Sequence, residues 1–105
     1  MGKAKSTTNI SMRRTTHSAT KTVSFRLNAP SATSIALVGD FNDWDPNARK
    51  MRRNKSGGWW VTIRLAPGVY QYKFVIDSIE WREDPENPRR ELNSYGTMNS
   101  VCEVA

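Results

Sequence analysis

Four aromatic residues lie outside the inward-facing positions of the strands expected from this sequence, and a surface aromatic side chain requires an explanation. They are Trp44, Trp60, Trp81 and Tyr95. An indole face stacks well on the C–H patches of a pyranose ring, whose hydroxyl groups need amides, hydroxyls or an ammonium nearby. Lys73, Thr97 and Asn99 are polar side chains of that type. These residues are therefore candidates for one sugar-binding platform.

The same tryptophans also have a purely structural interpretation. Trp44 ends the stretch Val38–Trp44, where an apolar strand runs into a polar turn. Its ring could fold back as a lid on the core, and Trp81 could pack under the proline-rich loop 84–88. Sequence spacing alone leaves both interpretations open.

The residues needed for catalysis are missing or isolated. The single histidine, His17, lies in the N-terminal segment, so the single cysteine, Cys102, has no imidazole partner and is expected to be a buried, inert thiol. One His and one Cys make no zinc site. The acidic stretch 40–45 resembles a calcium loop only faintly, because Trp44 occupies a ligand position. We therefore expect a noncatalytic domain without metal or cofactor.

The formal charge of +6 is concentrated at the N-terminus. Residues 1–22 contain five basic residues and no acidic one, so residues 23–105 account for only +1. This segment has almost no large apolar side chain and cannot offset its ordering entropy by burial. We expect a flexible basic tail over 1–22 and one folded domain over 23–105. Nucleic-acid binding through the tail and the basic segment 49–55 is a less favoured alternative.

Alternation of apolar and polar residues with a period of two predicts short β-strands along the folded part. The runs are 23–27, 34–38, 59–65, 69–76 and 101–104, with a short edge strand in 49–55. The parity places Trp59 in the core and Trp60 outside, and it places Lys73 on an outer face. The sequence Ala66–Gly68 predicts a tight turn that joins 59–65 and 69–76 as a hairpin.

The C-terminal third is expected to be less regular. A turn at Asp77 and Ser78 leads to a short strand at 79–81, and two prolines make 84–88 a loop. The segment 92–96 reads as irregular, and no stretch has useful helical periodicity. About seven short strands in a chain of 105 residues predict a small antiparallel β-sandwich.

Four motifs occur here in the order that they have in a known family. They are Val38–Trp44, Tyr70–Phe74, Trp81 with Asp84 and Pro85, and Gly96–Asn99. On these motifs the stretch from Val23 to Val104 resembles the family 48 carbohydrate-binding module. This module is the glycogen-binding domain of the AMP-activated protein kinase beta subunit and the early-set N-terminal domain of branching and debranching enzymes. The resemblance implies an all-β, immunoglobulin-like sandwich of the early-set type.

The resemblance also implies a set of carbohydrate-binding residues. They are Trp44, Lys73, Trp81, Tyr95, Thr97 and Asn99. The two tryptophans would stack on glucose, and Lys73 would hydrogen-bond hydroxyl groups. Thr97 and Asn99 would add contacts from the loop before the last strand. Tyr95 stands where the kinase module has a leucine that reaches the sugar, and Trp60 stands where it has a smaller residue.

Noncatalytic binding of α-1,4-glucans such as glycogen, starch and maltooligosaccharides is the leading hypothesis. The alternative is a protein-interaction or regulatory domain of the same fold that has lost sugar binding. The resemblance implies a kinase or a glucan enzyme as protein partner. We expect a cytoplasmic protein, since the single cysteine allows no internal disulfide and no apolar stretch is long enough to span a membrane.

Overall fold

The computed structural model describes residues 20–105, which form short strands and connecting loops. The elements are β2 (Lys21–Asn28), β3 (Ile35–Gly39), the 3₁₀ turn η1 (Asp40–Asn42), β4 (Arg52–Arg53), β5 (Gly58–Leu65), β6 (Gly68–Ile76), β7 (Glu80–Arg82), β8 (Arg90–Leu92) and β9 (Met98–Val104). Most of the predicted basic tail, with His17, lies outside the described residues. β2 begins at Lys21, ahead of the predicted start at Val23.

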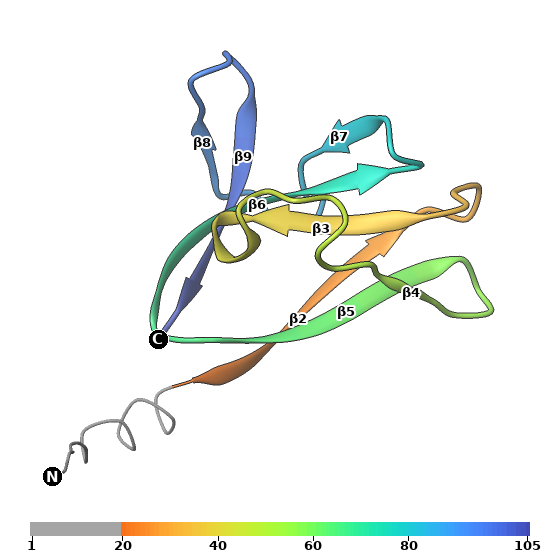
Figure 1. The fold of residues 1–105 in the computed structure, drawn as a ribbon, viewed down its shortest axis with the longest axis horizontal. Helices are drawn as coiled ribbons and strands as arrows, with labels where there is room; N and C mark the ends of the chain where they lie inside the picture. The colour runs from red at the N-terminus through yellow and green to blue at the C-terminus, as the bar shows by residue number, and fades with distance from the viewer. Residues whose placement is uncertain (1–19) are drawn as a thin grey trace, which may run out of the picture.

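The strands form two antiparallel sheets that face each other (Figure 1). One sheet has the order β2-β5-β4, and the other has the order β3-β6-β9-β8 with β7 also paired to β6. β3 runs along one side of β6, while β7 and β9 lie end to end on its other side. The domain is therefore the all-β antiparallel sandwich that the sequence predicts.

The core lies between the two sheets and follows the predicted parity. Trp59 is only 6% exposed, whereas its neighbour Trp60 is 38% exposed, because successive side chains of a strand point to opposite faces. The ring of Tyr72 meets those of Phe25 and Phe74 edge to face, with centroids 4.9 and 6.0 Å apart. These contacts bring aromatic residues of both sheets into one core.

The predicted hairpin between residues 59–65 and 69–76 is wrong. β5 pairs with β2 and β4, and β6 pairs with β3, β7 and β9, so Ala66 and Pro67 carry the chain from one sheet to the other. A tight turn can join the two strands of a hairpin, and it can equally carry the chain from one sheet to the other. The backbone groups of both strands find other partners, of which β2, β3 and β9 lie far away in the sequence.

Two predictions about the C-terminal part also need correction. Residues Arg90–Leu92 form β8, which pairs with Met98–Ser100 of β9 in a hairpin. Asn99 consequently lies within a strand rather than in the loop before it. The predicted edge strand at 49–55 is confirmed as β4, which pairs with the start of β5. Among the described residues, no helix is long and apolar enough to cross a membrane.

Candidate functional site

A groove of about 760 Å³ crosses the outer face of the five-stranded sheet. It is lined by Asp40, Trp44, Gln71, Lys73, Trp81, Asn93, Ser94, Tyr95, Thr97 and Asn99. The structure therefore brings together all six residues that the sequence singled out for sugar binding. They come from the turn after η1, from β6, β7 and β9, and from the β8–β9 loop.

A left-handed turn after η1 positions Trp44. Asp43 and Trp44 have φ values of 56° and 57°, a region that residues other than glycine rarely adopt. Asn42 holds this turn, because its Oδ1 accepts from the Gly39 N–H at 3.1 Å and its Nδ2 donates to the Leu37 carbonyl at 2.9 Å. Strain of this kind costs about 1–3 kcal/mol per residue and is found mainly where it places a functional side chain.

The indole of Trp44 is fixed at its polar edge and on one side. Its Nε1–H donates to Asp40 Oδ1 at 3.2 Å, and Asp40 Oδ2 accepts from the backbone N–H of Gln71 at 2.7 Å. The ring packs against an apolar cluster on the outer sheet face, made of Ala36, Val38 and Val75. Trp44 is half-buried, so it is partly the lid that the structural interpretation expected. That lid covers the outer face of the sheet and not the core between the sheets.

Trp81 lies on β7, directly opposite Val75 of β6, and is 46% exposed. β7 follows the turn at Asp77 and Ser78, both of which have positive φ. Asp77 Oδ1 accepts from the Thr33 N–H at 2.7 Å, the Thr33 hydroxyl at 2.9 Å and the Ser34 N–H at 3.0 Å. These hydrogen bonds hold the pKa of Asp77 below its ordinary value, with the Thr33 N–H contributing most. They also anchor the turn that presents Trp81.

Lys73 is the cation of the groove, and it is only 7% exposed. Its Nζ donates to Thr97 Oγ1 at 3.1 Å, and within residues 20–105 no carboxylate forms an ion pair with it. A buried ammonium without a counter-ion is costly unless its N–H groups find acceptors. Thr97 Oγ1 also accepts from Asn93 Nδ2 at 2.7 Å, which leaves the Thr97 O–H to donate. Lys73 and Thr97 thus present hydrogen-bond donors to the groove.

A chain of side-chain amides continues from these donors. Asn99 Nδ2 donates to Gln71 Oε1 at 2.8 Å, and Asn99 Oδ1 accepts from Asn93 Nδ2 at 2.9 Å. Gln71 Nε2 in turn donates to Glu91 Oε1 at 2.9 Å. Because Asn99 is buried and both ends of its amide are engaged, it positions its neighbours as well as lining the groove.

The tip of the β8–β9 hairpin carries Tyr95, which is 89% exposed. Asn93 Oδ1 accepts from the backbone N–H of Tyr95 at 2.9 Å and of Thr97 at 3.1 Å, so this one side chain closes the loop. Gly96 supplies the positive φ of 84° that the turn requires. In Figure 1 the tip of this hairpin projects beyond the other strands of the five-stranded sheet.

A buried hydrogen-bonded cluster joins β6 to the segment between β7 and β8. The Tyr72 hydroxyl donates to Asp84 Oδ2 at 2.7 Å and accepts from Asn87 Nδ2 at 3.0 Å, while the Asp84 N–H donates to Ser100 Oγ at 2.8 Å. Burial raises the pKa of the Tyr72 hydroxyl, which therefore stays protonated as a donor. The cluster fixes the segment that links Trp81 to the β8–β9 hairpin.

Sequence reasoning missed three residues of the groove that orient the predicted ones. Gln71 shares the outward parity of Lys73 on β6, and that parity was a usable signal. Asn93 precedes Ser-Tyr-Gly, a combination typical of a turn closed by an asparagine side chain. Asp40 had no usable signal, because the backbone N–H of Gln71 that it accepts from lies 31 positions away along the chain.

Two other candidate residues lie away from this groove. Trp60 is on the three-stranded sheet, where the Arg52 guanidinium carbon lies 5.6 Å from its ring centroid. Cys102 is a half-buried free thiol on β9, and burial raises its pKa. Within residues 20–105, no group of acidic, His and Cys side chains is arranged to hold a metal ion.

Several longer proteins are similar to this chain over part of their length. FLOURY ENDOSPERM 6, a chloroplastic protein of Oryza sativa subsp. japonica, is 39% identical over 70% of this chain and 13% of its own length. PTST homolog 2 of Arabidopsis thaliana, also chloroplastic, is 36% identical over 71% of this chain and 13% of its own length. The 1,4-alpha-glucan branching enzyme GlgB of Butyrivibrio fibrisolvens is 42% identical over 56% of this chain and 9% of its own length.

The fold has a counterpart among solved structures. The crystal structure of a maltogenic amylase from S. marinus matches 80% of this chain and 13% of the amylase chain, with a TM-score of 0.66 and 27% identity. The chain thus spans only about an eighth of the length of these longer proteins, or less. A family model described as the glycogen recognition site of AMP-activated protein kinase matches residues 21–105. This chain therefore belongs to the glycogen-recognition family of carbohydrate-binding modules.

Proposed function

We propose that residues 21–105 bind linear α-1,4-glucan chains, such as those of glycogen and starch, without cleaving them. The observation that supports this most directly is that two tryptophans, a tyrosine and a set of hydrogen-bond donors line one groove on one sheet face. The six residues proposed to contact the glucan are Trp44, Lys73, Trp81, Tyr95, Thr97 and Asn99.

Each class of side chain has a separate task in this proposal. Trp44 and Trp81 stack on the C–H faces of glucose units, because indole faces pack well on flat apolar patches. The Nε1–H of Trp44 is already bonded to Asp40, so this ring offers its face and not a hydrogen bond. Lys73 and the Thr97 hydroxyl donate to sugar oxygens. Tyr95, at the tip of the hairpin, closes over the chain.

Area estimates indicate a weak but useful affinity. If each indole removes on the order of 100 Å² from water, stacking contributes about 2.5 kcal/mol per ring. Lost translational and rotational freedom offsets much of this. A dissociation constant of roughly micromolar to millimolar is then expected for a short glucan. Such an affinity suits a module that localises a longer protein on a polymer with many repeated sites.

A depletion experiment tests the proposal. Insoluble starch or glycogen should remove the wild-type protein from solution and should leave Trp44→Ala and Trp81→Ala behind. Cellulose, whose glucose units have the other linkage, should remove none of the three. Binding that survives both substitutions would refute the assignment of the groove.

The second candidate is an interaction domain of the same fold that has lost sugar binding. The comparisons favour it less, since the matching family is defined by glycogen recognition. A flat calorimetric titration with maltoheptaose would support it.

We propose that the longer protein or its partner is a glucan-active enzyme or a kinase. The cytoplasmic location stays a prediction, because two of the plant relatives are chloroplastic.

A further inference from the structure

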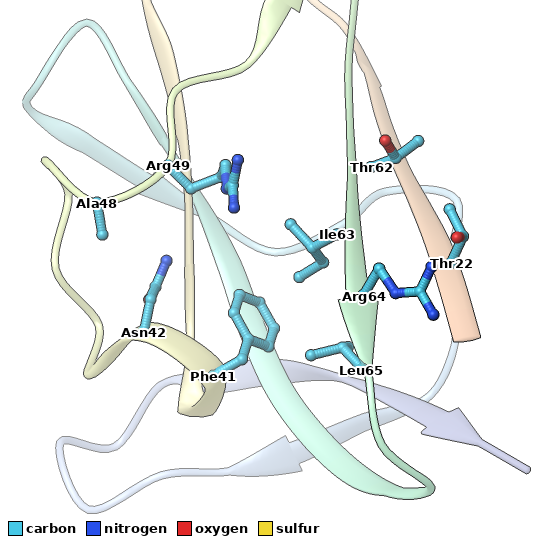
Figure 2. A pocket seen from close by; sticks show the side chains of 9 residues that line it. All are labelled: Thr22, Phe41, Asn42, Ala48, Arg49, Thr62, Ile63, Arg64 and Leu65. Carbon is cyan, nitrogen blue, oxygen red and sulfur yellow. The ribbon is translucent and has the colours of Figure 1, made fainter. Parts of the chain in front are cut away.

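A second groove, of about 740 Å³, lies between the edge of β5 and the segment 41–49 (Figure 2). Figure 2 shows Phe41, Ile63 and Leu65 pointing into the space between β5 and the segment that follows η1. Thr62 and Arg64 extend to the other side of the same strand. None of the residues that line this groove is acidic. It shares no lining residue with the proposed glucan groove.

The backbone along this edge has no strand partner among residues 20–105. β4 covers only Trp59 and Trp60 of β5, so the edge from Val61 to Leu65 is open on that side. The N–H and C=O of Gly58 both pair with Asn54 on the β4 side. Backbone groups of alternate residues in a strand point the same way, so those of Thr62 and Arg64 also point away from β2. Four backbone groups therefore face the groove.

Charge distinguishes this edge from an ordinary exposed strand. Arg49 lies on the loop side of the groove and Arg64 on the strand side, and neither forms an ion pair within the described residues. The Arg64 guanidinium donates to Thr20 Oγ1 at 2.7 Å, which leaves its other N–H groups available. An open edge flanked by two cations favours a ligand that supplies both a backbone and negative charge.

We propose that an extended, acidic peptide segment of a partner protein adds a strand to β5 at Thr62–Arg64. Its backbone pairs with the four open groups, as in other cases of strand addition. Its side chains alternate between the two faces of the sheet. Apolar ones pack on Phe41 and Ile63, and acidic ones on the other face meet Arg64, while Arg49 adds positive charge on the loop side.

Other occupants fit this groove less well. The chain's own residues 1–19 carry four basic and no acidic side chains, so they would add positive charge beside the arginines. A second copy of this edge would likewise bring arginine to arginine. The groove offers a glucan no well-exposed aromatic face. Phe41 is half-buried, and the centroid of its ring lies 5.9 Å from that of the Phe25 ring. A nucleic acid could pair with the charges but not with the backbone edge.

The first test measures peptide binding. The probe is a fluorescein-labelled decapeptide of alternating glutamate and valine, and its control is the same peptide with lysine in place of glutamate. The acidic probe should bind in fluorescence anisotropy at physiological salt, and the lysine peptide should not. Arg49→Glu should weaken binding at least tenfold. Lys55→Glu changes the net charge equally but lies outside the groove, so it should change affinity less than twofold.

The second test asks whether a strand is added. In the free protein, the amide protons of Thr62 and Arg64 should exchange quickly by NMR, while those of Val61 and Ile63, which face β2, should exchange slowly. The probe should slow the first pair at least tenfold and leave the second pair unchanged. Equal weakening by Arg49→Glu and Lys55→Glu would overturn the proposal. Binding of the acidic probe without slower exchange of the Thr62 and Arg64 amide protons would also overturn it. The same holds if a DNA oligonucleotide displaces the probe without slowing exchange at these two residues. Maltoheptaose binding is independent of this edge and should persist in every variant.

Discussion

The strands of the two sheets differ in charge. The strands β2, β4 and β5 contain five basic residues and no acidic one, whereas β3 and β6–β9 contain three of each. The acidic residues of the second sheet balance its charge and take part in its hydrogen bonds, as Glu91 does with Gln71. One fold thus combines a cationic sheet with a nearly neutral one.

Exposed tryptophans occur on both sheets, and their neighbours decide what each can bind. The face of Trp60 is approached by the Arg52 guanidinium at 5.6 Å, and Arg26 lies opposite Trp60 in the register with β2. Trp81 instead lies opposite Val75 and shares its groove with amides and hydroxyls. An exposed indole is therefore evidence for a sugar site only where no cation stacks on it and donors lie beside it.

The largest expected effect separates these two tryptophans. Trp81→Ala should lower the affinity for maltoheptaose by roughly 60-fold, which corresponds to about 2.5 kcal/mol of lost stacking. Trp60→Ala should leave the affinity unchanged. Isothermal titration calorimetry measures both, with circular dichroism melting curves to confirm folding. Equal losses for the two variants would show that surface aromaticity alone matters.

The next largest effect is expected from replacing one basic residue on each sheet by methionine. Lys73→Met should weaken maltoheptaose binding on the order of tenfold, since a hydrogen bond from a charged donor is lost. It should not lower the melting temperature, because Lys73 is buried without a carboxylate and methionine fills a similar volume. Arg26→Met on the other sheet should change neither quantity. A strongly destabilised Lys73→Met protein would mean that the ammonium supports the fold and not the ligand.

A smaller, pH-dependent effect should be confined to the neutral sheet. A carboxylate whose pKa is lowered by folding stabilises the native state above its ordinary value of 3.8, and this stabilisation is lost as pH falls through the folded-state pKa. Asp77→Asn should therefore lower the melting temperature at pH 7 but not at a pH well below 3.8. It should also weaken maltoheptaose binding modestly, because the Asp77 turn presents Trp81. An equal loss of stability at both pH values would contradict this role.

The smallest expected effect is that of salt on the affinity for maltoheptaose. Raising NaCl from about 50 to about 500 mM should change maltoheptaose affinity less than about twofold, since the glucan is uncharged. The acidic probe peptide at the β5 edge should weaken severalfold over the same range. Calorimetry and anisotropy on one protein sample compare the two faces directly. Parallel salt dependence would indicate that both ligands use the cationic sheet.

Much of the fold follows from local patterns in the sequence. The period of two separates Trp59 from Trp60 and places Lys73 outside, because parity is a property of the strand itself. The order of strands is not local: the turn at Ala66 and Pro67 is compatible with pairing of β5 and β6, yet both strands pair elsewhere. β8 was missed because three residues that begin with two charged side chains have no apolar alternation.

Some features of the candidate site can likewise be predicted from the sequence, and others cannot. Its aromatic residues and Lys73 could be predicted from residue type, parity and the family motifs. The links between Asp40 and the Gln71 backbone, or between Gln71 and Asn99, could not, because they join segments that meet only in the folded sheet. Residue type thus predicts what a groove can bind, whereas part of the orientation comes from hydrogen bonds between segments distant in the sequence.

The strained turn at Asp43 and Trp44 bears on how long the module stays bound at one site. An indole that is already held loses little side-chain freedom when a sugar arrives, which avoids a cost of about 0.5–1.5 kcal/mol. With an association rate constant of about 10⁶ M⁻¹ s⁻¹ and a dissociation constant of about 10⁻⁴ M, each contact lasts about 10 ms. Neighbouring glucose units keep the local ligand concentration high after each release. A protein carrying this module would therefore rebind many times each second and travel across a granule surface without leaving it.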